Sequence, residues 1–227
     1  IAKSIQSDTS FMEQHTGDAI REIKKSLRLA MNGVVSTLQR RQGLDYKINF
    51  GVEIPRLKEL ASNYQKDKML AEALWKENIR ESKLLAIFLY PAEEFAAETA
   101  ERWIDECPFT EIADHLCRNL LTSMPEAKQK ALMLIHKEEE MRRYCGYSIL
   151  SNLFRTGTTL DEAEEERYLQ ALEATICTTE SSCIPTCNAA TISLTKYTDD
   201  DRKKATDICD KIEKWDISRN EAVKNLI

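Results

Sequence analysis

The chain of 227 residues contains few of the residues that interrupt regular structure, with only 6 glycines and 5 prolines. Aromatic residues are also scarce, at 7%, whereas charged residues make up 31% of the sequence. No strand-like alternation of polar and apolar residues between hairpin turns is visible. A composition rich in Ala, Leu, Glu and Lys and poor in Gly and Pro is typical of helical proteins, so we expect an all-α fold.

Long apolar runs are missing as well. The longest, Leu84–Tyr90, is far too short to cross a bilayer, and no secretory signal sequence is recognisable. The 7 cysteines are an odd number, scattered along a chain that is not small, which favours reduced thiols over a disulfide framework. We therefore expect a cytoplasmic protein that does not bind membranes.

The formal net charge of −6 does not by itself indicate a nucleic-acid-binding protein. Its distribution is uneven, however. Residues 1–60 carry 10 Lys and Arg against 7 Asp and Glu, and residues 121–160 carry 6 against 4, so the remainder is strongly acidic. A solvated helical surface produces such a pattern, and so does a basic groove, and the charges alone leave both interpretations open.

Apolar residues recur at helical spacing along most of the chain. The expected helices are Asp18–Arg40, Pro55–Gln65, Asp67–Lys76, Ile79–Tyr90, Ala92–Glu106, Phe109–Leu121, Glu126–Lys137, Glu138–Arg155, Leu160–Cys177, Ser181–Tyr197 and Asp199–Trp215, followed by a short tail helix. From Asp67 onward they form pairs with a period of roughly 35 to 40 residues.

This pairing predicts a curved α-solenoid of HEAT-like antiparallel helix pairs, because each pair must stack on its neighbours to bury its apolar face. The alternative is a compact, irregular helical bundle. We expect a single domain over residues 1–227, with an N-terminal capping helix region in 1–48 and stacked helix pairs in 49–227.

Two stretches carry recognisable motifs. NFGVEIPRLKELA contains a GV-x-x-P-x-L-R/K element, made by Gly51, Val52, Pro55, Leu57 and Lys58. LAEALWKENIRESKLLAIFLY contains an LW element followed by E-x-K/R-x-x-A, made by Leu74, Trp75, Glu81, Lys83 and Ala86. Together with WIDECPFTEIADHLC and MRRYCGYSIL, these motifs resemble those of the HEAT-like-repeat DNA alkylation repair enzymes, the AlkD-like family. The resemblance extends from about Asn49 to Leu150.

The resemblance implies a set of site residues. FTEIAD is similar to the family's N-W-D-L-x-D motif, so Asp114 takes the place of the catalytic aspartate. Arg143 of EEMRRYCGYSIL takes the place of the family's arginine, and we assign it, with the adjacent Arg142, to binding DNA phosphates. The two aromatic positions of the family are occupied by Thr110 and Ile192, and Phe109 is the candidate for an aromatic contact.

The activity that the resemblance implies is removal of N3- or N7-alkylated purines from duplex DNA. An alkylated purine is already cationic, so the base departs as a neutral molecule and little general acid is needed. The enzyme needs a carboxylate near C1′ of the sugar, where a cation develops and where water attacks. Asp114 would be that carboxylate. The alternative, favoured by the loss of both aromatic residues, is a non-catalytic helical-repeat module that binds a nucleic-acid backbone or a protein.

The same residues also have purely structural interpretations. Asp114 and Arg118 are four residues apart, which is the spacing of an ordinary helical ion pair, and Thr110 could cap the helix that follows Pro108. Trp75 and Trp103 are expected in the core.

The sequence contains no recognisable metal or phosphate site. The closely spaced Cys177, Cys183 and Cys187 do not have the spacing of zinc ligands, and no Gly-rich phosphate loop is present. We expect no metal and no cofactor, and duplex DNA bound with modest affinity.

Overall fold

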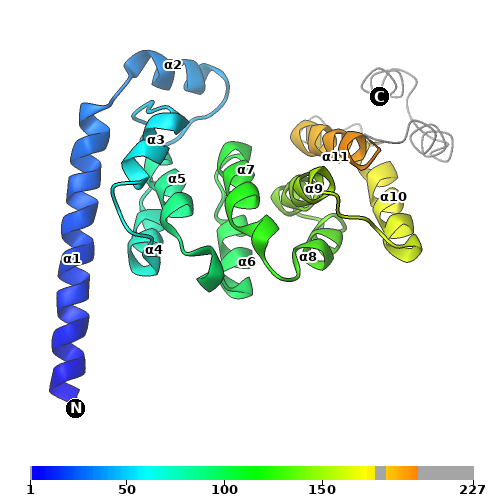
Figure 1. Ribbon diagram of the computed structural model, residues 1–227. Coiled ribbons are helices and arrows are strands. Elements are labelled where there is room, and N and C mark those ends of the chain that lie inside the picture. The colour runs from blue at the N-terminus through cyan, green and yellow to red at the C-terminus, as the bar shows by residue number, and fades with distance from the viewer. Residues whose placement is uncertain (1, 177–182, 199–227) are drawn as a thin grey trace. The chain divides into compact units, whose positions relative to one another are not determined.

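The computed structural model describes residues 2–176 and 183–198, with side chains from Gln14 onward (Figure 1). It divides into two compact units, residues 1–96 and residues 97–227. Among the described residues, all assigned secondary-structure elements are helices, and the only β-type pairing is one isolated bridge between Ile48 and Ile79. The prediction of an all-α protein is confirmed for these residues. In the same part of the chain, no helix combines the length and apolar character needed to span a membrane.

Unit 1 contains five α-helices and a short 3₁₀ helix: α1 (Ala2–Leu29), α2 (Gly33–Arg41), α3 (Ile54–Ala61), α4 (Lys68–Lys76), α5 (Arg80–Leu89) and η1 (Ala92–Glu94). The prediction of a single helix over Asp18–Arg40 is wrong, because α1 ends at Leu29 and a separate helix, α2, begins at Gly33. Asn32 starts a new helix there: its side chain accepts hydrogen bonds from the backbone amides of Val34 and Val35, at 3.1 and 3.2 Å.

The loop between α2 and α3 is held by buried charges on α5. Glu81 is fully buried and accepts hydrogen bonds from the amides of Phe50, at 3.1 Å, and Val52, at 3.2 Å. Arg80, also buried, lies 3.0 Å from Glu81 and donates to the carbonyl oxygen of Val52. Gly51 has a φ of +70°, and a Cβ there would lie 2.2 Å from the carbonyl oxygen of Asn32. Glycine is therefore required at this position of the motif.

Unit 2 contains the helices α6 (Ala97–Asp105), α7 (Thr110–Asn119), η2 (Leu121–Ser123), α8 (Ala127–Leu134), α9 (Glu140–Arg155), α10 (Glu162–Ile176) and α11 (Ile184–Tyr197). Each expected helix from residue 92 to residue 197 has its counterpart among these. The helix expected over 199–215 and the tail helix lie outside the described residues.

Helix α9 is central to unit 2, since it packs against α7, α8 and α11. Gly146 allows its close approach to α8, because a Cβ there would lie 2.7 Å from Cγ2 of Ile135 and 2.9 Å from its backbone nitrogen. Trp103 of α6 is completely buried, as is Trp75 in unit 1 at 1% exposure, so both predicted core positions are confirmed. The packing of α7 and α11 on either side of α9 creates the surface that carries the candidate site.

Candidate functional site

A hollow of about 480 Å³ lies on unit 2 across α7, α9 and α11. Its lining includes Thr110, Asp114 and Ile192, the three positions at which the resemblance places catalytic and aromatic residues. Thr110 and Asp114 come from α7, whereas Ile192 comes from α11, far away in the sequence. We call this the Asp114 hollow.

Asp114 is partly buried and is oriented by two hydroxyl groups of α9. Tyr144 donates a hydrogen bond to Oδ1 of Asp114 at 2.8 Å, and Ser148 donates to the same oxygen at 3.4 Å. Tyr144 and Ser148 are four residues apart on one helix, so both face α7. Both donors bind Oδ1, and no hydrogen bond to the second oxygen, Oδ2, is found among the described residues. The ion pair with Arg118 that the spacing suggested is not formed among the described residues.

The environment of Asp114 changes its protonation. Burial raises the pKa of the Asp114 carboxyl above its ordinary value, and the hydrogen bonds from Tyr144 and Ser148 oppose this effect without cancelling it. Burial and the nearby Asp114 charge also raise the pKa of Tyr144, so its hydroxyl remains a donor near neutral pH.

Positive charge lines the Asp114 hollow at the carboxyl ends of its helices. Arg118, Arg155 and Lys196 all line the hollow, and they lie in the last turns of α7, α9 and α11 respectively. Cations at helix C-termini interact favourably with the helix dipole, which helps to explain their position. The three helices thus bring three cations to the lining of one hollow.

The aromatic character of the hollow differs from that implied by the resemblance. Neither Thr110 nor Ile192 supplies a ring, and Phe109 does not line the hollow. Phe109 is instead the N-cap residue of α7, so the suggestion that Thr110 caps this helix is wrong. One ring does line the hollow, that of Tyr144.

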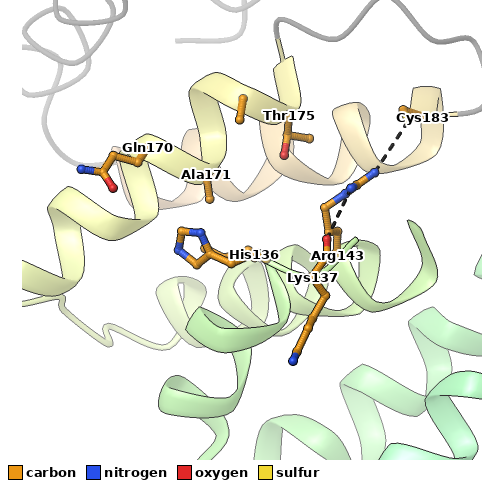
Figure 2. A pocket seen from close by; sticks show the side chains of 9 residues that line it. His136, Lys137, Arg143, Gln170, Ala171, Thr175 and Cys183 are labelled. Carbon is orange, nitrogen blue, oxygen red and sulfur yellow. Dashed lines mark hydrogen bonds between the residues drawn. The ribbon is translucent and has the colours of Figure 1, made fainter. Parts of the chain in front are cut away.

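Arg143 lines a second hollow, of about 380 Å³, together with His136, Thr175 and Cys183. Figure 2 shows its guanidinium reaching from α9 toward Cys183, whose sulfur lies 3.7 Å from Nη2. Nη1 donates to the carbonyl oxygens of Lys137 and Glu138, and Nη2 lies 2.6 Å from Glu140. Arg143 therefore does not share a hollow with Asp114, although it is adjacent in sequence to Tyr144, which does.

Arg142 forms ion pairs with two carboxylates of α6. It contacts Glu101 and lies 2.7 Å from Asp105. Its side chain is 18% exposed. The assignment of Arg142 and Arg143 to DNA phosphates stays a prediction.

Within the described residues, no group of three or more His, Cys, Asp or Glu side chains is placed to hold a metal ion. Of the three clustered cysteines, Cys183 is buried and Cys187 is partly exposed. Cys177 lies outside the described residues.

Sequence reasoning missed the residues that complete the Asp114 hollow. Tyr144 and Ser148 are about 30 residues from Asp114, and no local pattern connects them to it. Their four-residue spacing shows only that they share a face of α9. Arg155 and Lys196 carry a weak signal, since both lie in the last turn of a predicted helix, where a basic residue is common for structural reasons alone.

Comparisons with known proteins give the family and the fold of this chain. The family model described as DNA alkylation repair enzyme matches residues 39–181. One solved structure, described as "A new family of proteins related to the HEAT-like repeat DNA glycosylases with affinity for branched DNA structures", superposes with a TM-score of 0.74 at 17% sequence identity. The match covers 90% of this chain and 92% of that chain, so the predicted HEAT-like fold is confirmed. No curated protein sequence matches.

Proposed function

Because this chain belongs to the DNA alkylation repair enzyme family, we propose that it binds DNA and that the Asp114 hollow receives the sugar–phosphate backbone of one strand. The observation that carries this proposal is the meeting of Thr110, Asp114 and Ile192 in one hollow. Three positions chosen by resemblance alone lie together on the folded protein. The affinity for branched DNA described for the solved relative supports the same conclusion.

The three cations of the hollow, Arg118, Arg155 and Lys196, supply the charge that such binding needs. Lys and Arg side chains that neutralise phosphates release counterions, and this release provides most of the sequence-independent affinity for DNA. The net charge of −6 works against a high affinity, since much of the remaining surface repels the polyanion. We expect modest affinity that falls steeply with salt.

We propose, as the chemistry of this site, hydrolysis of the glycosidic bond of an N3- or N7-alkylated purine. The observation that favours it is the Asp114 carboxylate, which lines the hollow and is held through Oδ1. A fixed carboxylate beside C1′ stabilises the cation that develops as the bond breaks, and it can orient the attacking water. Tyr144 and Ser148 act here as positioning residues.

The second candidate is a DNA-binding module without catalysis. It is favoured by Thr110 and Ile192, because neither side chain can offer an aromatic face to a cationic base. Binding and catalysis make different demands on Asp114. A negative charge near phosphates weakens binding, whereas the same charge near C1′ accelerates cleavage, so a single substitution separates the two candidates.

The test of binding is a salt titration with duplex DNA. Arg118→Ala and Arg155→Ala should each weaken binding and reduce the slope of log affinity against log salt by about one contact. Arg143→Ala tests the prediction made from the resemblance in the same way. Arg102→Ala, which removes a charge from α6 outside the hollow, is the matched control. No DNA binding by the wild type at low salt would contradict the proposal.

The test of catalysis is release of methylated purine from alkylated duplex DNA. Asp114→Asn should slow release by on the order of 10²–10³-fold, while DNA affinity stays level or rises. Asp161→Asn, an exposed aspartate of the same unit, is the control. Thr110→Trp should raise the rate by restoring an aromatic face. Equal rates for the wild type, Asp114→Asn and DNA alone would leave the module as the function.

A further inference from the structure

The ring of Tyr144 is the one aromatic group that lines the Asp114 hollow among the described residues. Tyr144 is partly exposed, and its hydroxyl donates a hydrogen bond to Oδ1 of Asp114 at 2.8 Å. The ring carbon that carries the hydroxyl is one bond away from that donor oxygen. A ligand that touches the carboxylate of Asp114 therefore also lies within reach of the ring.

Other aromatic rings of this protein contact a ring or a cation. In unit 2, three aromatic side chains form a cluster with ring centroids 4.7–5.6 Å apart, namely Phe154, Tyr168 and Tyr197. In unit 1, Nζ of Lys83 lies 4.2 Å from the centroid of the Trp75 ring. Within the part of the chain that the structure describes, the Tyr144 ring has no partner of either kind, although three cations line the same hollow. The surface of this ring is therefore available to a ligand.

The charges of the hollow indicate which ligand fits. Asp114 is the one acidic residue that lines it in the described part of the chain. The face of an aromatic ring is also electrically negative, so the carboxylate and the ring together attract a cation. Arg118, Arg155 and Lys196 repel a free cation but attract phosphates. The ligand that satisfies both sets of charges is a cationic base attached to a nucleic-acid strand.

We infer that Tyr144 is the aromatic contact for the cationic nucleotide, and that its ring makes the site distinguish a charged base from a neutral one. This inference rests on the proposed function and adds the residue that sets its specificity. The resemblance placed the aromatic residues on α7 and α11, at Thr110 and Ile192, whereas here the ring comes from α9. The hydrogen bond to Asp114 holds the ring in place before the ligand arrives, so little side-chain entropy is lost on binding.

The test measures the affinity of the protein for two duplexes that differ only in the charge of one base. The first contains 7-methylguanine, which is cationic, and the second contains 7-deaza-7-methylguanine, which has the same shape and no charge. Both carry a 2′-fluorinated sugar at that position, which slows loss of the base. The wild type should bind the cationic duplex more tightly. The ratio of the two affinities measures the discrimination of each variant, because a general loss of DNA binding lowers both affinities alike.

Tyr144→Leu removes the ring and should reduce this ratio by about fivefold. Tyr144→Phe keeps the ring and loses the hydroxyl, so it should keep the wild-type ratio. Tyr144→Met, with a flexible apolar chain in place of the ring, is the second ring-free variant if the leucine variant does not fold. Tyr64→Leu, at a partly exposed tyrosine of unit 1, is the matched control and should leave the ratio unchanged.

Four results would overturn the inference while leaving the proposed DNA binding intact. The first two are equal affinity of the wild type for both duplexes and an unchanged ratio in the ring-free variants. The third is a fall in Tyr144→Phe equal to that in Tyr144→Leu, which would mean that only the orientation of Asp114 matters. The fourth is the same fall in Phe109→Leu alone, which would assign the contact to Phe109. A wild type that binds neither duplex would overturn the proposed function and this inference with it.

Discussion

The two oxygens of Glu81 are both used by unit 1, whereas the two hydroxyls that bind Asp114 in unit 2 share a single oxygen. Oε2 of Glu81 accepts from the amide of Phe50, and Oε1 accepts from the amide of Val52 and from Arg80. Glu81 is completely buried, but Asp114 lines a hollow. Both residues belong to motifs of the same family, and their burial and the pattern of their partners distinguish them.

This difference separates a structural carboxylate from one that is available to a ligand. A buried charge is tolerated when its hydrogen-bonding capacity is satisfied by fixed neighbours, and it then stabilises the arrangement of those neighbours. A carboxylate oriented through one oxygen keeps the other for a substrate. The comparison therefore predicts a large effect on stability at Glu81 and a small one at Asp114.

The largest effect is expected from Glu81→Gln. The substitution breaks the buried ion pair between Glu81 and Arg80, and breaking such a pair typically costs about 3–5 kcal/mol of unfolding free energy. Denaturant unfolding of the variant and the wild type measures the loss. Glu59→Gln, in an exposed pair with Arg56, should change stability by less than about 1 kcal/mol. Similar losses of unfolding free energy for the two variants would contradict a structural role for the Glu81 carboxylate.

A smaller loss of stability is expected from a change in α9, the helix whose Tyr144 and Ser148 bind Asp114. Gly146→Ala places a methyl group against Ile135 and should cost about 1–3 kcal/mol. Gly17→Ala is the control with the opposite sign, because nothing lies within 4 Å of the added methyl in α1. Glycine inside a helix is less favourable than alanine, so that change should stabilise by about 0.5–1 kcal/mol. Thermal unfolding distinguishes the two.

The smallest effect is expected from Asp114→Asn, and it should depend on pH. Because the pKa of Asp114 is raised in the folded protein, the folded state binds this proton more tightly than the unfolded state does. The free energy of unfolding of the wild type therefore falls as the pH rises from about 3.9, the ordinary pKa of Asp, through the raised pKa of folded Asp114. The variant should melt slightly above the wild type at pH 7, by less than either change above.

Comparing the melting of the wild type and Asp114→Asn at acidic pH checks that prediction. Below the ordinary pKa of Asp, both states of the wild type carry the proton, so the difference between wild type and variant should disappear. Melting curves at neutral and acidic pH measure it. A variant that is less stable than the wild type at pH 7 would mean that the Asp114 carboxylate supports the fold, as Glu81 does.

Much of the fold follows from local signals in the sequence. Asp67 begins α4 as predicted, with its side chain accepting from the amide of Leu70 at 2.7 Å, and Pro91 follows the end of α5. The break between α1 and α2 was missed because the apolar spacing continues across it. The local signal of the break was Asn32, a preferred N-cap residue whose amide also contacts the loop at Phe50.

The candidate site was predictable only in part, for a geometrical reason. Adjacent residues of a helix point in directions about 100° apart, so Arg143 and Tyr144 enter different hollows although they are neighbours in sequence. Alignment to a motif places a residue on an element but does not fix what surrounds it. Asp114 could be identified from the motif, whereas its partner Tyr144 depends on the packing of α7 against α9.

The carboxylate of Glu81 also determines how fast solvent reaches a loop. The amides of Phe50 and Val52 lie outside any helix, where backbone hydrogens usually exchange with water quickly. Here each is bonded to a buried side chain on α5, so exchange requires that the ion pair be opened first. In deuterium exchange these two amides should therefore be protected like those of the unit 1 core. The loop, although irregular, should exchange as slowly as the interior of a helix.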